Sequence, residues 1–275
     1  MFEGSKYAYY GMYLVGFAIM MFVNLRTYKK YQLSKRTSVV ITLITYFAGV
    51  CGAKIMGDWY TAAVAKYDAG TSSVAIFGAV IFTPAFMTAV ALLFGKTWRQ
   101  IMDLLAPGIF IILTCAKFGC FMAGCCAGKE CSFGVYNPIY DAVLFPSQLF
   151  ESITMCFVIA FCFVYGMKNK KCRSGSVYPV TAIVYSVTRF AWEFMRYYPN
   201  DEVRHIMFGM TFWQFWCLIT IAISILWLVL LRSERLSVLE EKYYAWHEKS
   251  VRKILDRNKK NIVHHNKNKK KYHKK

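Results

Sequence analysis

The sequence predicts an all-α, polytopic membrane protein with seven transmembrane helices, the N-terminus outside and the C-terminus in the cytoplasm. Hydrophobic residues make up 57% of the 275 residues and charged residues only 18%, whereas soluble domains contain about 45–50% apolar residues. Several apolar stretches are long enough to cross a hydrocarbon core of about 30 Å. These stretches are continuous rather than alternating, which favours helices over strands as the spanning elements.

The predicted spans form one membrane domain over residues 1–231. The links after the first, third and fifth spans are basic, as is the segment after the seventh, so the positive-inside rule assigns all four to the cytoplasm. Residues 57–72, 124–145 and 197–206 are then outer loops. The spans cover about residues 7–25, 39–56, 73–94, 101–123 (interrupted at Pro107-Gly108), 147–167, 177–195 and 207–231.

Residues 232–275 form a basic cytoplasmic tail, with 15 Lys/Arg and 5 Asp/Glu in a chain of net charge +19. Such a cluster directly after a membrane span is expected to contact anionic inner-leaflet lipids, and nucleic acid is the less favoured partner. Leu236, Leu239, Tyr243 and Trp246 recur at helical spacing, which predicts an interfacial helix. Beyond Arg257 the composition predicts disorder.

Ionisable residues near the end of the sixth span are the strongest functional signal. At 100° per residue, Tyr185, Arg189, Glu193 and Arg196 fall on one face of a helix. A charge near the middle of a membrane helix costs about 2.5–3.5 kcal/mol on insertion scales, so such groups usually mark a functional site. An interfacial ion pair that anchors the helix end is the alternative.

Three other segments contain polar groups or exposed backbone at the outer side of the membrane. Lys117 ends an apolar span and precedes Gly124 and Gly128, whose N–H groups can bind a phosphate, although a glycine-rich turn with a snorkelling lysine is the alternative. Pro146 begins a helix that carries Gln148 and Glu151 into the membrane, where they need partners unless they only cap the helix. Tyr10 lies near the outer interface, and Gly11 and Gly16 permit close helix approach.

These segments together predict an outer-leaflet cleft with three cations and two carboxylates. The cations suit a lipid phosphate, and the carboxylates can position or deprotonate a nucleophile. The residues are Lys117, Arg189, Arg196, Glu151 and Glu193.

The cysteines predict no metal site. Cys120, Cys125, Cys126 and Cys131 lack a paired C-x-x-C arrangement and a nearby histidine, which disfavours structural zinc. A disulfide that involves Cys131 at the outer side is the somewhat better prediction. Cysteines inside the apolar runs are expected to act as small buried hydrophobes.

These motifs resemble those of the prolipoprotein diacylglyceryl transferase family, in order and over nearly all of residues 7–231. Phe145–Glu151 is similar to the family's H-P-S-Q-L-Y-E motif, and Tyr185–Arg196 is similar to its Y-x-x-x-R-F-x-x-E-F-x-R stretch. Ala116–Gly128 resembles the signature G-R-x-G-N-F-x-N-G-E-x-x-G, and Tyr10-Gly11 with Gly16 resembles Y-G-x-x-x-x-x-G in the first span.

The resemblance implies a multi-pass transferase of the bacterial plasma membrane that needs no cofactor. It would transfer a diacylglyceryl group from phosphatidylglycerol to the lipobox cysteine of prolipoproteins. Arg189, Glu193, Lys117 and Tyr185 would be catalytic. The lipid-binding residues would be Tyr10, Gly124, Gly128, Gln148, Glu151 and Arg196.

The sequence also departs from the family pattern. Lys117 stands where the family signature has Arg, Cys120 where it has Asn, and Cys125 where it has Glu. Phe77 replaces a histidine and Lys54 an arginine, so the group that activates the acceptor thiol is unassigned. Two alternatives follow: a paralogue that uses the same donor on another acceptor, and a non-catalytic phospholipid-binding protein.

Overall fold

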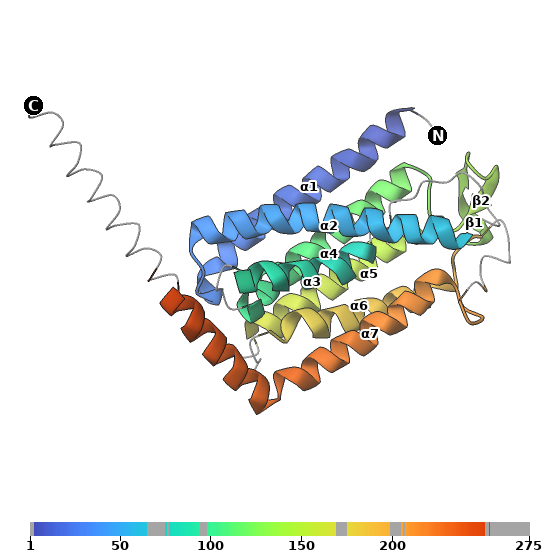
Figure 1. The fold of residues 1–275 in the computed structure, drawn as a ribbon. Coiled ribbons are helices and arrows are strands. Elements are labelled where there is room, and N and C mark those ends of the chain that lie inside the picture. The colour runs from blue at the N-terminus through green and yellow to red at the C-terminus, as the bar shows by residue number, and fades with distance from the viewer. Residues whose placement is uncertain are drawn as a thin grey trace, which may run out of the picture.

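A bundle of helices forms the body of the protein, with a small β-hairpin at one end (Figure 1). The computed structural model describes residues 3–64, 75, 77–93, 98–168, 175–198, 205, 207–250 and 253. A 3₁₀ turn (Tyr28–Tyr31) follows the first helix, and a π-helical turn (Val164–Lys168) follows the fifth. The main helices are α1 (Glu3–Thr27), α2 (Lys35–Val64), α3 (Phe77–Leu93), α4 (Trp98–Met122), α5 (Ser147–Phe163), α6 (Val177–Glu193) and α7 (Phe212–Leu231).

The helices confirm a polytopic membrane protein. Five of those in the described residues are long and apolar enough to cross a bilayer, and the shorter α3 is also apolar. Two details of the prediction are wrong. α2 continues to Val64, into the predicted outer loop, and α4 runs without a break through Pro107. Close packing of α1 supports α4 at this point, since a Cβ on Gly108 would lie 2.4 Å from Met20 Cγ.

The segment predicted as a long outer loop contains an antiparallel hairpin instead. Strand β1 (Glu130–Asn137) pairs with β2 (Ala142–Leu144), and an irregularity separates the pairs that Glu130 and Val135 each make with Leu144. Asn137 fixes the hairpin to the end of α4, because its Nδ2 donates to Gly124 O at 2.7 Å and its Oδ1 accepts from Ile139 N at 2.9 Å. The hairpin lies at the same end of the bundle as the N-terminus (Figure 1).

Small residues let neighbouring helices approach closely, which membrane helices often require. A Cβ on Gly78 of α3 would lie 2.1 Å from Gly52 O of α2, so the two backbones touch there. Gly16 of α1 packs against α4, as predicted, because its Cβ would lie 3.1 Å from Ile112 Cα. Among the described residues, nothing lies within 4 Å of a Cβ placed on Gly11, so Gly11 makes no such contact there.

Gly78→Ala should therefore lower the free energy of unfolding by about 1–3 kcal/mol or more, the usual cost of overpacking. Gly11→Ala is the matched control, because its added methyl group meets open space. Thermal unfolding of the two variants in the same detergent measures the difference. Equal stabilities would contradict the α2–α3 contact.

A buried carboxylate at the opposite end of the bundle fixes the start of α6. Asp103 on α4 accepts from Gly175 N at 2.6 Å and from Val177 N at 3.0 Å. Its position suits the helix N-terminus, where unpaired N–H groups favour negative charge. The sequence analysis did not identify Asp103, although it is an acidic residue within an apolar span.

The beginning of the tail, residues 234–250, is helical as predicted, but it packs against the helix bundle. Glu240 pairs with Arg99 of α4 at 2.7 Å and also accepts from Trp98 Nε1. Tyr243 Oη donates to Leu92 O at 2.6 Å, so the tail helix also contacts α3. Residues 258–275, where disorder was predicted, lie outside the described residues.

Glu240→Ala should loosen this helix, because Arg99 is mostly buried and would lose its carboxylate partner. We expect trypsin to cleave after Lys242 several-fold faster in this variant. Glu241→Ala is the control, since the neighbouring carboxylate is exposed. Equal cleavage of both variants would contradict docking through Glu240.

Candidate functional site

The five charged residues of the predicted cleft lie together at the hairpin end of the bundle. Lys117 Nζ of α4 is 2.5 Å from Glu151 Oε2 of α5, and Arg189 Nη1 is 2.6 Å from Glu193 Oε2 on α6. Arg196 joins the two pairs, because its Nη2 is 3.4 Å from Glu151 Oε1 and its Nε is 3.9 Å from Glu193 Oε2. Both carboxylates are only 3% exposed. The cluster is therefore a buried ionic network with one more cation than carboxylates.

Arg189 retains hydrogen-bonding capacity. Among the described residues its charged partner is Glu193, and Nη1 makes no hydrogen bond of good geometry despite the short separation. A guanidinium carries five N–H donors in a planar fork that matches two phosphate oxygens. Arg189 is 6% exposed, so an anion that reached it would be held away from water.

The second oxygen of Glu193 is used by a residue that the sequence analysis missed. Tyr198, which follows α6, donates its hydroxyl to Glu193 Oε1. Burial raises the pKa of Tyr198 well above its ordinary value, and the charge of Glu193 raises it further. The phenol therefore stays protonated and holds Glu193 beside Arg189.

Arg196 follows the end of α6, and backbone pairing between two chain segments fixes its place. Gly128 and Arg196 form an isolated antiparallel bridge, and Lys129 N donates to Met195 O at 2.9 Å. Arg196 Nη1 donates to Cys126 O. The segment after α4 therefore holds the Arg196 guanidinium in place through the carbonyl group of Cys126.

The two glycines predicted to bind a phosphate through backbone N–H groups have other hydrogen bonds. Gly124 N donates to Phe121 O at 3.1 Å, and Gly128 N donates to Phe145 O at 2.8 Å. Neither N–H group is free for a headgroup. Gly124 instead has a φ of +70°, which favours glycine, and a Cβ on Gly128 would lie 2.9 Å from Phe145 O. Both glycines therefore determine the backbone conformation of the segment that follows α4.

Gln148 lies beside the ionic network, buried at the start of α5. Its Nε2 donates to Cys125 O at 2.6 Å, while its Oε1 has no hydrogen-bond partner in the described structure. A buried amide oxygen without a partner costs free energy, so a ligand hydroxyl at this position would be favoured.

Tyr185 lies on α6 one turn before Arg189. Its ring centroid is 5.6 Å from that of Phe77 and 5.6 Å from that of Phe110. Phe77 thus packs against the candidate site at the start of α3. Cys217 on α7 is fully buried, as expected for a cysteine inside an apolar run.

Tyr10 lies apart from the ionic network. It is 62% exposed and lines an apolar groove of about 350 Å³ between α1, α2, α3 and α4. Leu113 lines the same groove and precedes Lys117 by one helical turn. The lining of the groove therefore comes within one helical turn of Lys117 along α4.

The predicted disulfide is not formed, because Cys131 is a free thiol.

Helices that can span a bilayer, with a buried ionic network at one end of the bundle, define a multi-pass membrane protein. The model of the family "Prolipoprotein diacylglyceryl transferase" matches residues 3–230. The chain therefore belongs to the prolipoprotein diacylglyceryl transferase family. It is a transferase of the cytoplasmic membrane, and the reaction is diacylglyceryl transfer to prolipoproteins.

Two clostridial proteins are similar to this chain. Phosphatidylglycerol–prolipoprotein diacylglyceryl transferase 2 of Clostridium perfringens (strain 13 / Type A) is 31% identical over 220 residues, which cover 73% of this chain and 83% of that protein. The phosphatidylglycerol–prolipoprotein diacylglyceryl transferase of Clostridium tetani (strain Massachusetts / E88) is 33% identical over 139 residues, 47% of this chain and 53% of the relative.

Proposed function

We propose that the donor is phosphatidylglycerol and that Arg189 binds and polarises its phosphate. This proposal rests on the buried ionic network, which has one more cation than carboxylates. It also rests on Arg189 Nη1, which makes no hydrogen bond of good geometry among the described residues. The names of the clostridial relatives support the same donor. Lys117 is the second cation, and Glu193 orients Arg189.

The reaction is a displacement at a glycerol carbon. The acceptor thiolate forms a carbon–sulfur bond as the carbon–oxygen bond to phosphate breaks, and glycerol phosphate leaves with the electron pair. Cations placed where this charge develops lower the barrier. Arg196 and Lys117 also favour the thiolate form of an acceptor cysteine that enters the cluster, since nearby cations lower a thiol pKa.

The lipid itself would contact the remaining candidate residues. The apolar groove beside Tyr10 suits an acyl chain, because its lining comes within one helical turn of Lys117. Gln148 Oε1 suits a headgroup hydroxyl, since it is a buried acceptor without a partner. Tyr185 braces Arg189 from the preceding turn. Gly124 and Gly128 act indirectly, by fixing the carbonyl groups that hold Gln148 and Arg196.

The transfer reaction tests the proposal directly. Purified protein in phosphatidylglycerol vesicles should transfer labelled diacylglyceryl to a lipobox peptide and release glycerol phosphate. A peptide with serine in place of the lipobox cysteine is the control. Transfer from phosphatidylethanolamine at the same rate would contradict the donor assignment, and lipid binding without turnover would contradict the assigned roles.

We also propose that all seven helices α1–α7 cross the membrane and that the ionic network lies near its outer surface. A reporter active only outside the cytoplasm should give signal when fused after residue 135 in the hairpin. Fusions after residue 30 or residue 260 should give none. Signal at residue 30 would overturn the seven-span topology.

The tail, residues 232–275, would then be a cytoplasmic module at the other end of the bundle. Its basic residues suit the anionic inner leaflet. Vesicle binding by a peptide of residues 251–275 should require anionic lipid and weaken with salt.

A further inference from the structure

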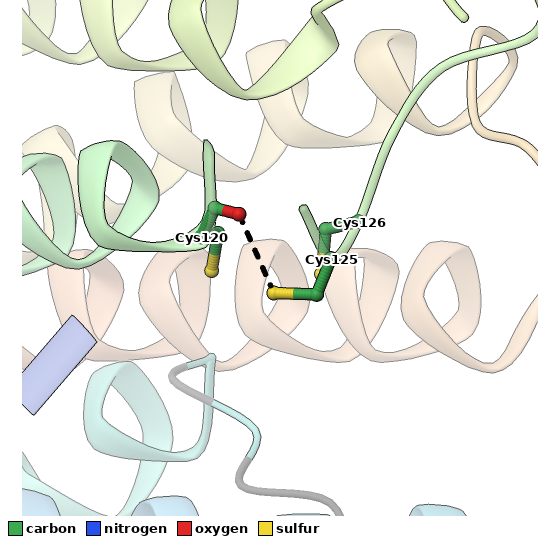
Figure 2. Close-up of side chains that lie close together, drawn as sticks. All are labelled: Cys120, Cys125 and Cys126. Atoms are coloured by element: carbon green, nitrogen blue, oxygen red, sulfur yellow. Dashed lines mark hydrogen bonds between the residues drawn. The ribbon is translucent and has the colours of Figure 1, made fainter. Parts of the chain in front are cut away.

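Three cysteine thiols meet where α4 ends and the following segment turns back. Cys120 is near the end of α4, and Cys125 and Cys126 lie on that segment (Figure 2). Their Sγ atoms all lie within 4.8 Å of one another. The sequence spacing gave no sign of this cluster, because the chain reversal at Gly124 brings the thiols together.

The backbone holds the cluster in place. Cys125 N donates to Cys120 O at 3.1 Å, and Cys125 Sγ lies 3.6 Å from the same oxygen (Figure 2). Cys126 has a φ of +63°, which is uncommon for a residue other than glycine. Such strained positions persist where the surrounding structure fixes them, and they gather at functional sites. Here Arg196 and Ser147 fix Cys126 through its carbonyl oxygen.

Two cationic side chains lie beside the cluster. Arg196 Nη1 donates to Cys126 O, and Lys117 lies on α4 three residues before Cys120. The thiolate is the form that binds metal ions.

We propose that Cys120, Cys125 and Cys126 bind a thiophilic d¹⁰ metal ion, Zn²⁺ or Cu⁺, at the edge of the transferase site. Zinc–sulfur bonds of about 2.3 Å place tetrahedral sulfurs roughly 3.8 Å apart, so the cluster needs to contract by about 1 Å or less. Soft thiolate ligands select these two ions. For Zn²⁺ the fourth position stays open to an exogenous ligand, as in catalytic zinc sites, whereas Cu⁺ accepts three sulfurs.

Metal binding is measured without reference to transfer activity. The full-length protein is stripped with a chelator and then titrated with Zn²⁺ alone, or with Cu⁺ alone against a colorimetric Cu⁺ chelator. One equivalent of either ion should bind. Cys125→Ser and Cys126→Ser should each weaken binding by more than about 100-fold. Cys131→Ser is the matched control on the same outer segment and should bind like the wild type.

A second measurement avoids variants that fail to fold. Trypsin releases residues 118–129 as one peptide with all three cysteines, and Cys131 lies on the next peptide. Bound metal should slow alkylation of the 118–129 peptide at least ten-fold and leave Cys131 unchanged. Absence of stoichiometric binding by both ions, or equal protection of Cys131, would overturn the proposal.

Discussion

Arg189→Lys should lower the rate of diacylglyceryl transfer by about two orders of magnitude, the scale expected when one preorganised charge-stabilising donor is lost. Lysine keeps the positive charge beside Glu193, so the ionic network and the fold should survive. It cannot donate to two phosphate oxygens in one plane, which the guanidinium can do. The loss should therefore affect turnover more than stability.

The measurement is transfer of labelled lipid to a lipobox peptide by variants with matched melting temperatures. Lys117→Arg is the control, because it makes the opposite exchange at the neighbouring cation and should keep or raise the rate. Near-normal transfer by Arg189→Lys would show that bidentate phosphate binding is not required at this position.

Glu151→Gln should have the largest effect on stability. The carboxylate lies 2.5 Å from Lys117 and 3.4 Å from Arg196, so its neutralisation leaves two largely buried cations without their shared partner. Removing one member of a buried ion pair costs about 3–5 kcal/mol. The free energy of unfolding should fall by this amount although the side chain keeps its shape.

Asp58→Asn provides the matched control, since the Asp58–Lys54 pair on α2 is more than half exposed. Exposed pairs contribute at most about 1 kcal/mol. Adding Lys117→Met to Glu151→Gln should recover part of the lost stability, because one unpaired cation is removed. A double variant less stable than both single variants would contradict the network.

Local sequence patterns predicted the helices and the Arg189–Glu193 part of the candidate site. The apolar runs marked α1–α7, and helical periodicity placed Arg189 and Glu193 on one face, where they form an ion pair. These features depend on neighbours within four residues.

Features that depend on contacts between distant segments were not predictable in the same way. The Lys117–Glu151 pair joins two helices, and Arg196 reaches it from beyond the end of α6. The hairpin was missed because its two strands are short and pair across a turn that the sequence analysis did not identify. Chain reversals determine the hydrogen bonds of Gly124 and Gly128. They also bring the three thiols close together. The spacing of residues in the sequence does not specify such reversals.

The groove beside α1 has a consequence for how the reaction rate is measured. Tyr10 and Leu14, both 62% exposed, line this groove, and under the proposed function a lipid would enter it sideways from the bilayer without passing through water. The quantity that governs occupancy is then the mole fraction of donor among the surrounding lipids, not its amount per volume of solution. Diluting vesicles with buffer should leave the rate per enzyme unchanged, whereas diluting the donor with inert lipid should slow it.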